Sequence, residues 1–188
     1  MIHTEFEHLV YENRFIEVWD DDVRFKDGTR GTYLRISTKP TNDHGVVVIP
    51  RRGLDFCLVK TYRYPLGRVQ LAFPRGFGEG GAPEEDARRE LKEETGLDSL
   101  NTRLLGWVTP DSGLLTSRVA VVGAEVPGTV ASVLDVREVD EVVWLSAPLM
   151  LKLMSTGELD DAFTLSALML AVAQRWIPNA DFLASRHL

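Results

Sequence analysis

The sequence predicts a mixed α/β (α+β) fold, in which a small antiparallel β unit precedes a larger domain. Three observations lead to this prediction. The chain has 188 residues, 44% of them hydrophobic, which suits one globular domain plus a modest appendage. Short apolar runs bounded by turn residues recur along it. Stretches with helix start and stop signals stand between and after these runs. We expect the β unit to span 1–45 and the main domain to span 46–188.

The N-terminal unit is expected to contain a hairpin that turns at Asp27-Gly28. Such a unit cannot hide both of its faces alone, so it must pack on the main domain or on a second subunit. The run Asp20, Asp21, Asp22 could hold a metal, but consecutive residues point in different directions, and we interpret it as a solvated turn. The strands predicted in this unit are 15–19, 23–25 and 32–37.

The main domain begins after a turn-rich junction at 39–43. Two strands are followed by a glycine-rich loop at 74–81, which leads into a helix at 83–95. Pro83 suits the first helical position, and Gly96 suits the left-handed cap after the last. A short helix follows Ser146 and stops at Gly157, and a longer helix is expected at 162–176. The strands predicted in this domain are 46–50, 56–62, 103–108, 118–126 and 142–145.

Composition excludes several classes of protein. A net charge of -7 and a pI near 5.1 argue against a general polyanion-binding surface, so we expect no nucleic-acid partner. The single cysteine, Cys57, lies in an apolar run and is interpreted as a buried core residue. The N-terminus is acidic where a signal peptide would be basic, and no stretch reaches the roughly 20 apolar residues of a membrane span. We therefore expect a soluble cytoplasmic protein without a membrane partner.

The helix at 83–95 carries acids at both ends. Those in its first turn lie where the helix dipole stabilises anions. Glu90, Glu93 and Glu94 lie near its end, where the dipole disfavours each negative charge by ~0.3 to 1 kcal/mol. At four-residue spacing, Asp86, Glu90 and Glu94 form a stripe without a base, and like charges there repel. A divalent cation would resolve the conflict, because Mg²⁺ is commonly held by one or two carboxylates, water and a substrate phosphate. The alternative is a solvated, charge-rich helix face.

Residues 74–97 resemble the Nudix box, whose pattern is Gly, five residues, Glu, seven residues, Arg-Glu-aliphatic-x-Glu-Glu-x-Gly-aliphatic. The first half departs from it, because Gly81 stands where the pattern has Glu, and the glycine comes one residue late at Gly76. The resemblance implies a Nudix α/β/α sandwich with a mixed β-sheet. The second half matches at every fixed position: Arg89, Glu90, Leu91, Glu93, Glu94, Gly96 and Leu97.

The resemblance also implies a metal site. In the family, the glutamates that match Glu90 and Glu94 bind divalent metals, and the one that matches Glu93 often joins them. The carbonyl before the first glycine, here that of Arg75, also reaches a metal. We therefore expect Mg²⁺, with Mn²⁺ as an alternative.

A second group of box residues shapes the site. In relatives the box glutamate braces the helix arginine, here Arg89, which we assign with Glu93 to the catalytic set. Gly81 replaces that glutamate, and Glu85, one helical turn before Arg89, is the expected substitute. Gly76, assigned to substrate binding, and the glycines after it let the backbone approach a ligand. A flexible tight turn is the alternative.

The likeness extends over most of the chain and narrows it to the ADP-ribose pyrophosphatase-like branch. In this branch two subunits exchange N-terminal units, which implies a homodimer, and aromatic side chains clamp the adenine. By position these are Phe15 and Tyr33, although either could instead pack the sheet. Arg63 matches an arginine that contacts the substrate phosphates or ribose, with a surface ion pair as the alternative. The segments that carry the likeness are 10–33, 60–65 and 157–171.

The implied reaction is attack of water on a diphosphate that joins two moieties, which would convert ADP-ribose to AMP and ribose 5-phosphate. Glu138, in an acidic stretch before a predicted strand, is assigned as the base, with Asp140 or Glu141 as a further metal ligand or alternative base. A solvated acidic loop is the alternative interpretation. Many relatives have Glu-x-Pro where this chain has 72–74, Ala-Phe-Pro, which leaves the substrate open. Nucleotide sugars, NADH and dinucleoside polyphosphates are alternative substrates, and a non-catalytic ADP-ribose or NAD sensor is an alternative function.

Overall fold

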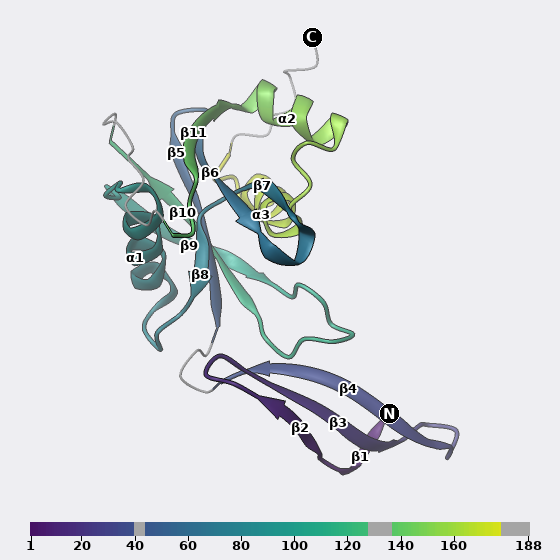
Figure 1. Cartoon of the computed structure of the whole chain (residues 1–188). Coiled ribbons are helices and arrows are strands. Elements are labelled where there is room, and N and C mark those ends of the chain that lie inside the picture. Colours follow the sequence, from purple (N-terminus) through teal and green to yellow (C-terminus); the bar gives the residue numbers. More distant parts are fainter. Residues whose placement is uncertain (40–43, 128–136, 178–188) are drawn as a thin grey trace.

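The computed structural model describes residues 1–39, 44–127 and 137–177. It confirms a mixed fold in which a central sheet is covered by helix α1 on one face and by α2 and α3 on the other (Figure 1). A separate small sheet is formed by the N-terminal residues. The described helices are α1 (Pro83–Thr95), α2 (Ala147–Thr156) and α3 (Ala162–Ala173), with a 3₁₀ turn at Tyr64–Leu66.

The N-terminal sheet is antiparallel and is centred on β3. The predicted hairpin between β3 and β4 is confirmed, because Gly28 has a φ of 89° and Thr29 N donates to Asp27 Oδ1 at 3.0 Å. Two further strands, which the sequence patterns do not predict, pair with the other edge of β3. The bounds are β1 (His3–Phe6), β2 (Leu9–Glu12), β3 (Ile16–Arg24) and β4 (Arg30–Thr38).

The interpretation of the acidic run 20–22 as a solvated turn is wrong, because β3 continues through it without a break. Asp21 is only 4% exposed and forms an ion pair with Arg35 of the neighbouring β4. The Arg35 guanidinium also lies over the Trp19 ring, 4.6 Å from its centroid. A cross-strand arginine thus replaces the water that a turn would have supplied to the buried carboxylate.

The central sheet is mixed, as the fold class predicts. Its strands follow the order β11-β6-β5-β10-β9, with β7 on β6 and β8 on β5. β5 and β10 are parallel, and the other pairs are antiparallel. The sequence patterns do not predict the short strands β7 and β8. The bounds are β5 (Gly45–Arg52), β6 (Asp55–Arg63), β7 (Arg68–Ala72), β8 (Arg75–Phe77), β9 (Asn101–Val108), β10 (Val119–Glu125) and β11 (Glu141–Ser146).

The helix ends follow their sequence signals. The predicted bounds of α1 are confirmed, and the glycine after it, Gly96, has a φ of 69°. α2 ends before Gly157, with a φ of 76°. α3 ends three residues earlier than predicted, and at its start the Asp161 side chain accepts from Thr164 N at 2.9 Å. None of the helices in the described parts of the chain is long and apolar enough to cross a membrane.

Two apolar clusters hold the sandwich together, because alternate residues of a strand face opposite sides of a sheet. Val47 and Ile49 of β5 belong to the cluster under α2 and α3, whereas Val46 and Val48 belong to the cluster under α1. Cys57, fully buried in the second cluster, is confirmed as a core residue, and burial raises the pKa of its thiol to about 12. α1 contributes Ala87 and Leu91 to this cluster, and it also contacts β8 of the same sheet.

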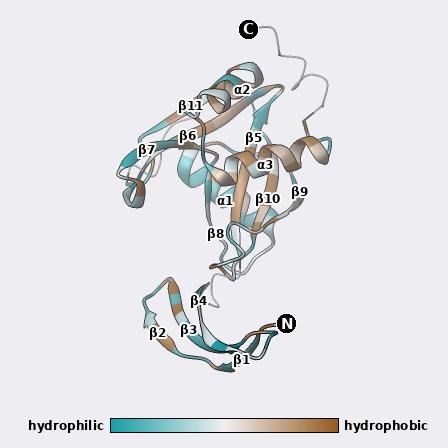
Figure 2. Ribbon diagram, turned by 90° about the vertical axis from the view of Figure 1, so that its right-hand side faces the viewer, coloured by the Kyte–Doolittle hydropathy of each residue, from teal (hydrophilic) through white to brown (hydrophobic). Residues whose placement is uncertain are grey.

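The N-terminal sheet has almost no core of its own. Within residues 1–39 only Asp21 and Val23 are buried. The sheet stands beside one end of the main domain (Figure 2), and the β4 edge is hydrogen-bonded to it, Ile36 N to Leu114 O at 2.8 Å and Thr116 N to Ile36 O at 3.0 Å. Many apolar side chains of this sheet are therefore exposed: Phe6, Leu9, Val10, Tyr11, Phe15, Tyr33 and Leu34.

Candidate functional site

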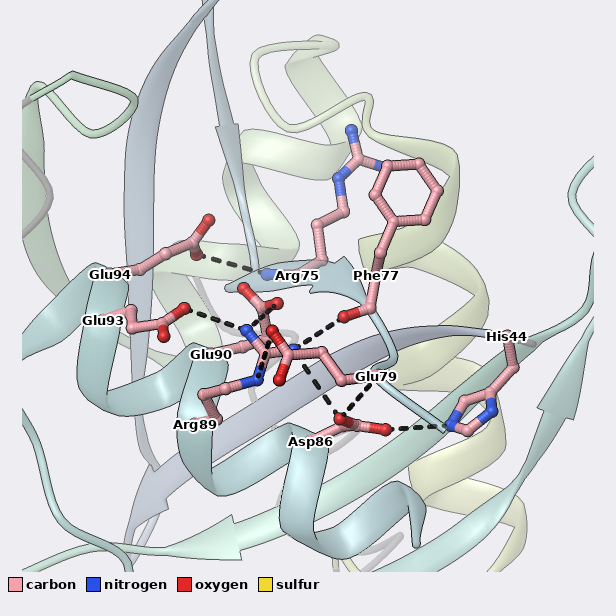
Figure 3. A network of polar contacts seen from close by, with 9 residues as sticks. All are labelled: His44, Arg75, Phe77, Glu79, Asp86, Arg89, Glu90, Glu93 and Glu94. Atoms are coloured by element: carbon pink, nitrogen blue, oxygen red, sulfur yellow. Dashed lines mark hydrogen bonds and ion pairs between the residues drawn. The ribbon is translucent and has the colours of Figure 1, made fainter. Parts of the chain in front are cut away.

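Two glutamates of α1 lie between that helix and the short strand β8 (Figure 3). Glu90 and Glu94 are only 8% and 7% exposed. Gly76 makes room for the first, since a Cβ at this position would lie 2.2 Å from Glu90 Oε1. The neighbouring Arg75 N donates to Glu94 Oε2 at 3.2 Å. β8 thus positions both acids, and Gly76 leaves the space that the Glu90 carboxylate occupies because it has no side chain.

Arg89 holds the outer part of the same cluster. Its guanidinium forms ion pairs with Glu90 Oε1 at 2.9 Å and with Glu93 Oε2 at 3.0 Å, and donates to Phe77 O at 2.7 Å (Figure 3). Burial works against the charge of Arg89, but Glu90 and Glu93 raise its pKa above the ordinary value. Glu93 is exposed, so the structure places it on the Arg89 side of α1, apart from the buried pair.

The substitute brace predicted at Glu85 is not found among the described partners of Arg89. Arg89 instead lies 3.6 Å from Asp86 Oδ1 and 3.8 Å from Glu79 Oε1. Glu85 lies beside Gly81, where an added Cβ would be 3.2 Å from its Oε2. The glycine-rich loop folds back over α1 at this point, since Glu79 N donates to Asp86 Oδ1 at 3.0 Å.

Asp86 has a second, buried neighbour that sequence reasoning left without a role. His44 Nε2 lies 3.4 Å from Asp86 Oδ2, close enough for an ion pair, although neither atom has a well-aligned hydrogen bond among the described residues. The His44 carbonyl accepts from Gly78 N at 2.7 Å. His44 therefore ties the glycine-rich loop to the start of β5, and no spacing in the sequence signals this contact.

Burial sets the charge state of the two inner glutamates. It raises the pKa of Glu90 to about 7 and that of Glu94 to about 8. The charge of Glu90 raises the pKa of Glu94 further, and Glu138 adds to both shifts. Glu138, from the loop before β11, therefore lies within electrostatic range of both buried carboxylates. The structure brings these three acids toward one another from distant parts of the chain.

The donor set at this place fits a hard divalent cation. Glu90 and Glu94 offer carboxylate oxygens that repel one another and are shielded from water. Across the ranges that the structure describes, no three acidic, histidine or cysteine side chains form a ready-made metal cluster. Two carboxylates suffice for Mg²⁺, however, because water and substrate phosphates usually complete its coordination. A cation would replace Arg89 as the counter-charge of Glu90.

The shifted pKa values predict an unusual pH dependence of stability for the metal-free protein. Because the native pKa values of Glu90 and Glu94 lie above the ordinary 4.5, the native state binds more protons than the unfolded state between pH 4.5 and about 8. The free energy of unfolding should therefore fall as the pH rises through this window. We expect Tm in EDTA to drop by about 5 °C or more from pH 5 to pH 8.

Magnesium should oppose this loss, since it binds the deprotonated carboxylates. Differential scanning fluorimetry with and without Mg²⁺ should show a larger metal-induced rise in Tm at pH 8 than at pH 6. A Tm in EDTA that stays level or rises from pH 5 to pH 8 would show that these carboxylates are not destabilised by burial.

A polar cavity of about 390 Å³ lies beside the predicted base and arginine. The Arg63 Nε atom is buried and has no hydrogen-bond partner among the described residues. Glu141 does not line this cavity and pairs with Lys60 at 2.6 Å. Another cavity, of about 430 Å³, lies at the β5–β6 turn and contains none of the predicted site residues. The polar cavity is lined by Thr61, Tyr62, Arg63, Tyr64, Pro65, Arg137, Glu138 and Asp140.

The two predicted adenine-clamp residues lie far apart within one chain. The Phe15 ring is nearly parallel to the Phe77 ring, at 11°, with centroids 6.4 Å apart. Phe15 O accepts from Lys39 N, whereas Tyr33 is paired with Asp21. Six residues of extended chain between positions 33 and 39 span roughly 20 Å. Phe15 and Tyr33 of the same chain therefore cannot sandwich one base.

Sequence reasoning missed two site features on the α3 side. One is the Arg75 side chain, which pairs with Asp161 at 3.2 Å, whereas only the Arg75 carbonyl was assigned. The other is Asp161 itself. An aspartate directly before a predicted helix with a threonine three residues later is an N-cap signal, so the cap could have been predicted but its ion pair could not.

Comparison with known proteins identifies relatives that match more than half of this chain. A family model described as NUDIX domain matches residues 40–165. The ADP compounds hydrolase NudE of Escherichia coli (strain K12) is 28% identical over 117 residues, 62% of this chain and 62% of that protein. The ADP-sugar pyrophosphatase of Mus musculus is 34% identical over 133 residues, 65% of this chain and 60% of that protein. The matched regions thus span about 60% of the length of these two relatives.

A solved structure confirms the fold over nearly the whole chain. The crystal structure of an ADP compounds hydrolase superposes with a TM-score of 0.79 and covers 96% of each chain. The sequences are 23% identical, so this likeness concerns the fold alone. It includes the N-terminal residues, which the family model does not match.

Proposed function

The chain belongs to the Nudix family, and from this premise we propose that it is a divalent-metal-dependent pyrophosphohydrolase of nucleoside diphosphate derivatives. One observation carries the proposal. Glu90 and Glu94, which match the metal-binding positions of the box, are buried together against β8 with Glu138 in electrostatic range. Buried carboxylates that repel one another are costly in a merely structural helix, but they suit a site that receives a cation.

ADP-ribose is the substrate that we propose first. The names of the two relatives, an ADP compounds hydrolase and an ADP-sugar pyrophosphatase, support an ADP moiety joined through a diphosphate. The products would be AMP and ribose 5-phosphate. Nucleotide sugars, NADH and dinucleoside polyphosphates share the diphosphate and are the alternative substrates. A non-catalytic sensor would not need Glu90, Glu93 and Glu94 together, and their presence favours the enzyme.

In the proposed reaction, a water oxygen bonds to one phosphorus of the diphosphate while the bond from that phosphorus to the bridging oxygen breaks. Mg²⁺, held by Glu90, Glu94 and the Arg75 carbonyl, would neutralise phosphate charge and acidify the attacking water. Glu138 accepts the water proton at a carboxylate oxygen, and its place at the rim of the polar cavity supports this role. Arg63, in the same cavity, binds phosphate oxygens, which would give its buried Nε a partner.

We also propose that the N-terminal sheets of two subunits pair in a homodimer. Within residues 1–39 the sheet buries only two residues, and it exposes large apolar side chains that include the strand neighbours Tyr33 and Leu34. Exposed apolar surface of this extent is typical of an interface. Exchange of these units would bring Phe15 of one subunit and Tyr33 of its partner to a common adenine pocket. Light scattering at micromolar concentration tests the dimer, and a stable monomer would remove both the interface and the shared clamp.

The activity is tested with a panel of diphosphates and separation of the products by chromatography. We expect ADP-ribose with Mg²⁺ or Mn²⁺ to give AMP and ribose 5-phosphate, and EDTA to stop the reaction. ADP-glucose, NADH and a dinucleoside triphosphate serve as competing substrates, and a clear preference for one of them would redirect the assignment. Tight binding of ADP-ribose without any AMP would support the sensor instead.

A further inference from the structure

The Arg75 side chain is held rigidly on the face of β8 that lies opposite Glu90. Successive side chains of a strand alternate, so Arg75 points away from α1 where Gly76 faces it (Figure 3). Its guanidinium lies 3.2 Å from Asp161 Oδ1 and stacks over the Phe163 ring, 4.3 Å from the centroid. Asp161 is 4% exposed and is itself held by Thr164 as the cap of α3. These two contacts restrain the position of the guanidinium.

A second guanidinium, that of Arg63, lies within electrostatic range of Arg75. Burial lowers the pKa of Arg75 and the charge of Asp161 opposes that shift, but Arg63 lowers the pKa further. The two arginines therefore repel one another, and the Arg63 Nε is buried without a hydrogen-bond partner among the described residues. The Arg63 Nε, which has no partner in the part of the chain that the structure describes, and the Arg75 guanidinium within electrostatic range of Arg63 together suit a bound oxyanion.

We propose that the Arg75 guanidinium, oriented by Asp161 and Phe163, binds the diphosphate of the substrate together with Arg63. This inference rests on the proposed function and extends it, since the resemblance assigns only the Arg75 carbonyl. The backbone N–H of Arg75 donates to Glu94. The backbone of Arg75 would thus lie at the cation site while its guanidinium binds the diphosphate. Asp161 would be a positioning residue that acts through Arg75.

The test measures binding without hydrolysis. Calorimetry with the non-hydrolysable α,β-methylene analogue of ADP-ribose, in the presence of Mg²⁺, compares Arg75→Met and Asp161→Asn with the unchanged protein. Loss of charge-assisted hydrogen bonds should raise the Kd of Arg75→Met about 10-fold or more. Asp161→Asn keeps a side chain that can cap α3 but loses the ion pair, so it should weaken binding in the same direction by a smaller factor. Arg75→Lys, which keeps the charge without the planar fork, should not restore full affinity.

A neighbouring pair provides the matched control. Arg68 and Asp160 form an exposed ion pair between β7 and the start of α3. Arg68→Met and Asp160→Asn should leave the Kd within about 2-fold.

If the unchanged protein does not bind the analogue, the proposed function fails and the inference with it.

A different result would contradict the inference about Arg75 and leave the proposed function standing. If the unchanged protein binds the analogue and Arg75→Met binds it equally well, only the inference falls, and Arg75 is a structural tie between β8 and α3. Asp161→Asn decides in the same way if Arg75→Met does not fold. If Asp161→Asn binds the analogue with unchanged affinity but has a lowered Tm, the ion pair between Arg75 and Asp161 only stabilises the fold.

Discussion

Glu94→Gln is expected to lower kcat/KM for ADP-ribose by about a thousandfold or more, because the cation loses an anionic ligand whose support of transition-state charge contributes several kcal/mol. Mg²⁺ binding, measured by calorimetry, should weaken in parallel. The Gln oxygen can still accept the hydrogen bond from Arg75 N, so the local backbone should persist. The charge is thus the only large change at this position.

The stability of this variant should move in the opposite direction. Burial raises the pKa of Glu94 to about 8, so removing its charge should raise the Tm of the metal-free protein at pH 8. Glu85→Gln, exposed on the first turn of the same helix, is the matched control and should change neither activity nor Mg²⁺ affinity. Near-normal activity in Glu94→Gln would contradict the proposed metal site, and with it the main argument for hydrolysis.

Glu138→Gln is expected to lower kcat by about 10²- to 10⁴-fold, the range typical of a lost general base. KM and the affinity for Mg²⁺ should change little, because Gln keeps the size of the side chain and Glu90 and Glu94 still hold the cation. Steady-state kinetics together with calorimetry separate these effects.

Two neighbours of Glu138 serve as comparisons. Glu141→Gln should retain most activity, since Glu141 pairs with Lys60 and does not line the polar cavity. Asp140 does line it, so full activity in Glu138→Gln combined with a large loss in Asp140→Asn would transfer the role of the base to Asp140.

Local signals allowed much of the fold to be predicted. The bounds of α1 follow from Pro83 and Gly96, whose backbone preferences act within a single turn. The strands around Val46 and Phe56 follow from continuous apolar runs. By contrast, β8 has only three residues and lies in a glycine-rich loop, so no periodicity could reveal it. The acidic run at 20–22 misled sequence reasoning because its partner, Arg35, comes from another strand.

The candidate site, like the fold, could be predicted only in part from the sequence. The spacing of Glu90 and Glu94 on one helix, and their match to a family motif, could be found in the sequence. The contact of Arg89 with Glu79 could not, since Glu79 approaches only because the glycine-rich loop folds back over α1. Asp86, by contrast, lies three residues before Arg89 on the same helix, a spacing that brings side chains together. Whether an acid on that helix is buried also depends on what packs over it, which separates Glu94 from the exposed Glu93.

The sequence by itself determined the family and indicated the helix and the kind of chemistry that we propose, because these depend on residue types at short, fixed spacings. Tertiary structure alone decided which carboxylates lose their water, which arginines line the polar cavity and how far Phe15 lies from Tyr33. Desolvation and charge repulsion act through space, and the residues that exert them here are separated by tens of positions along the chain.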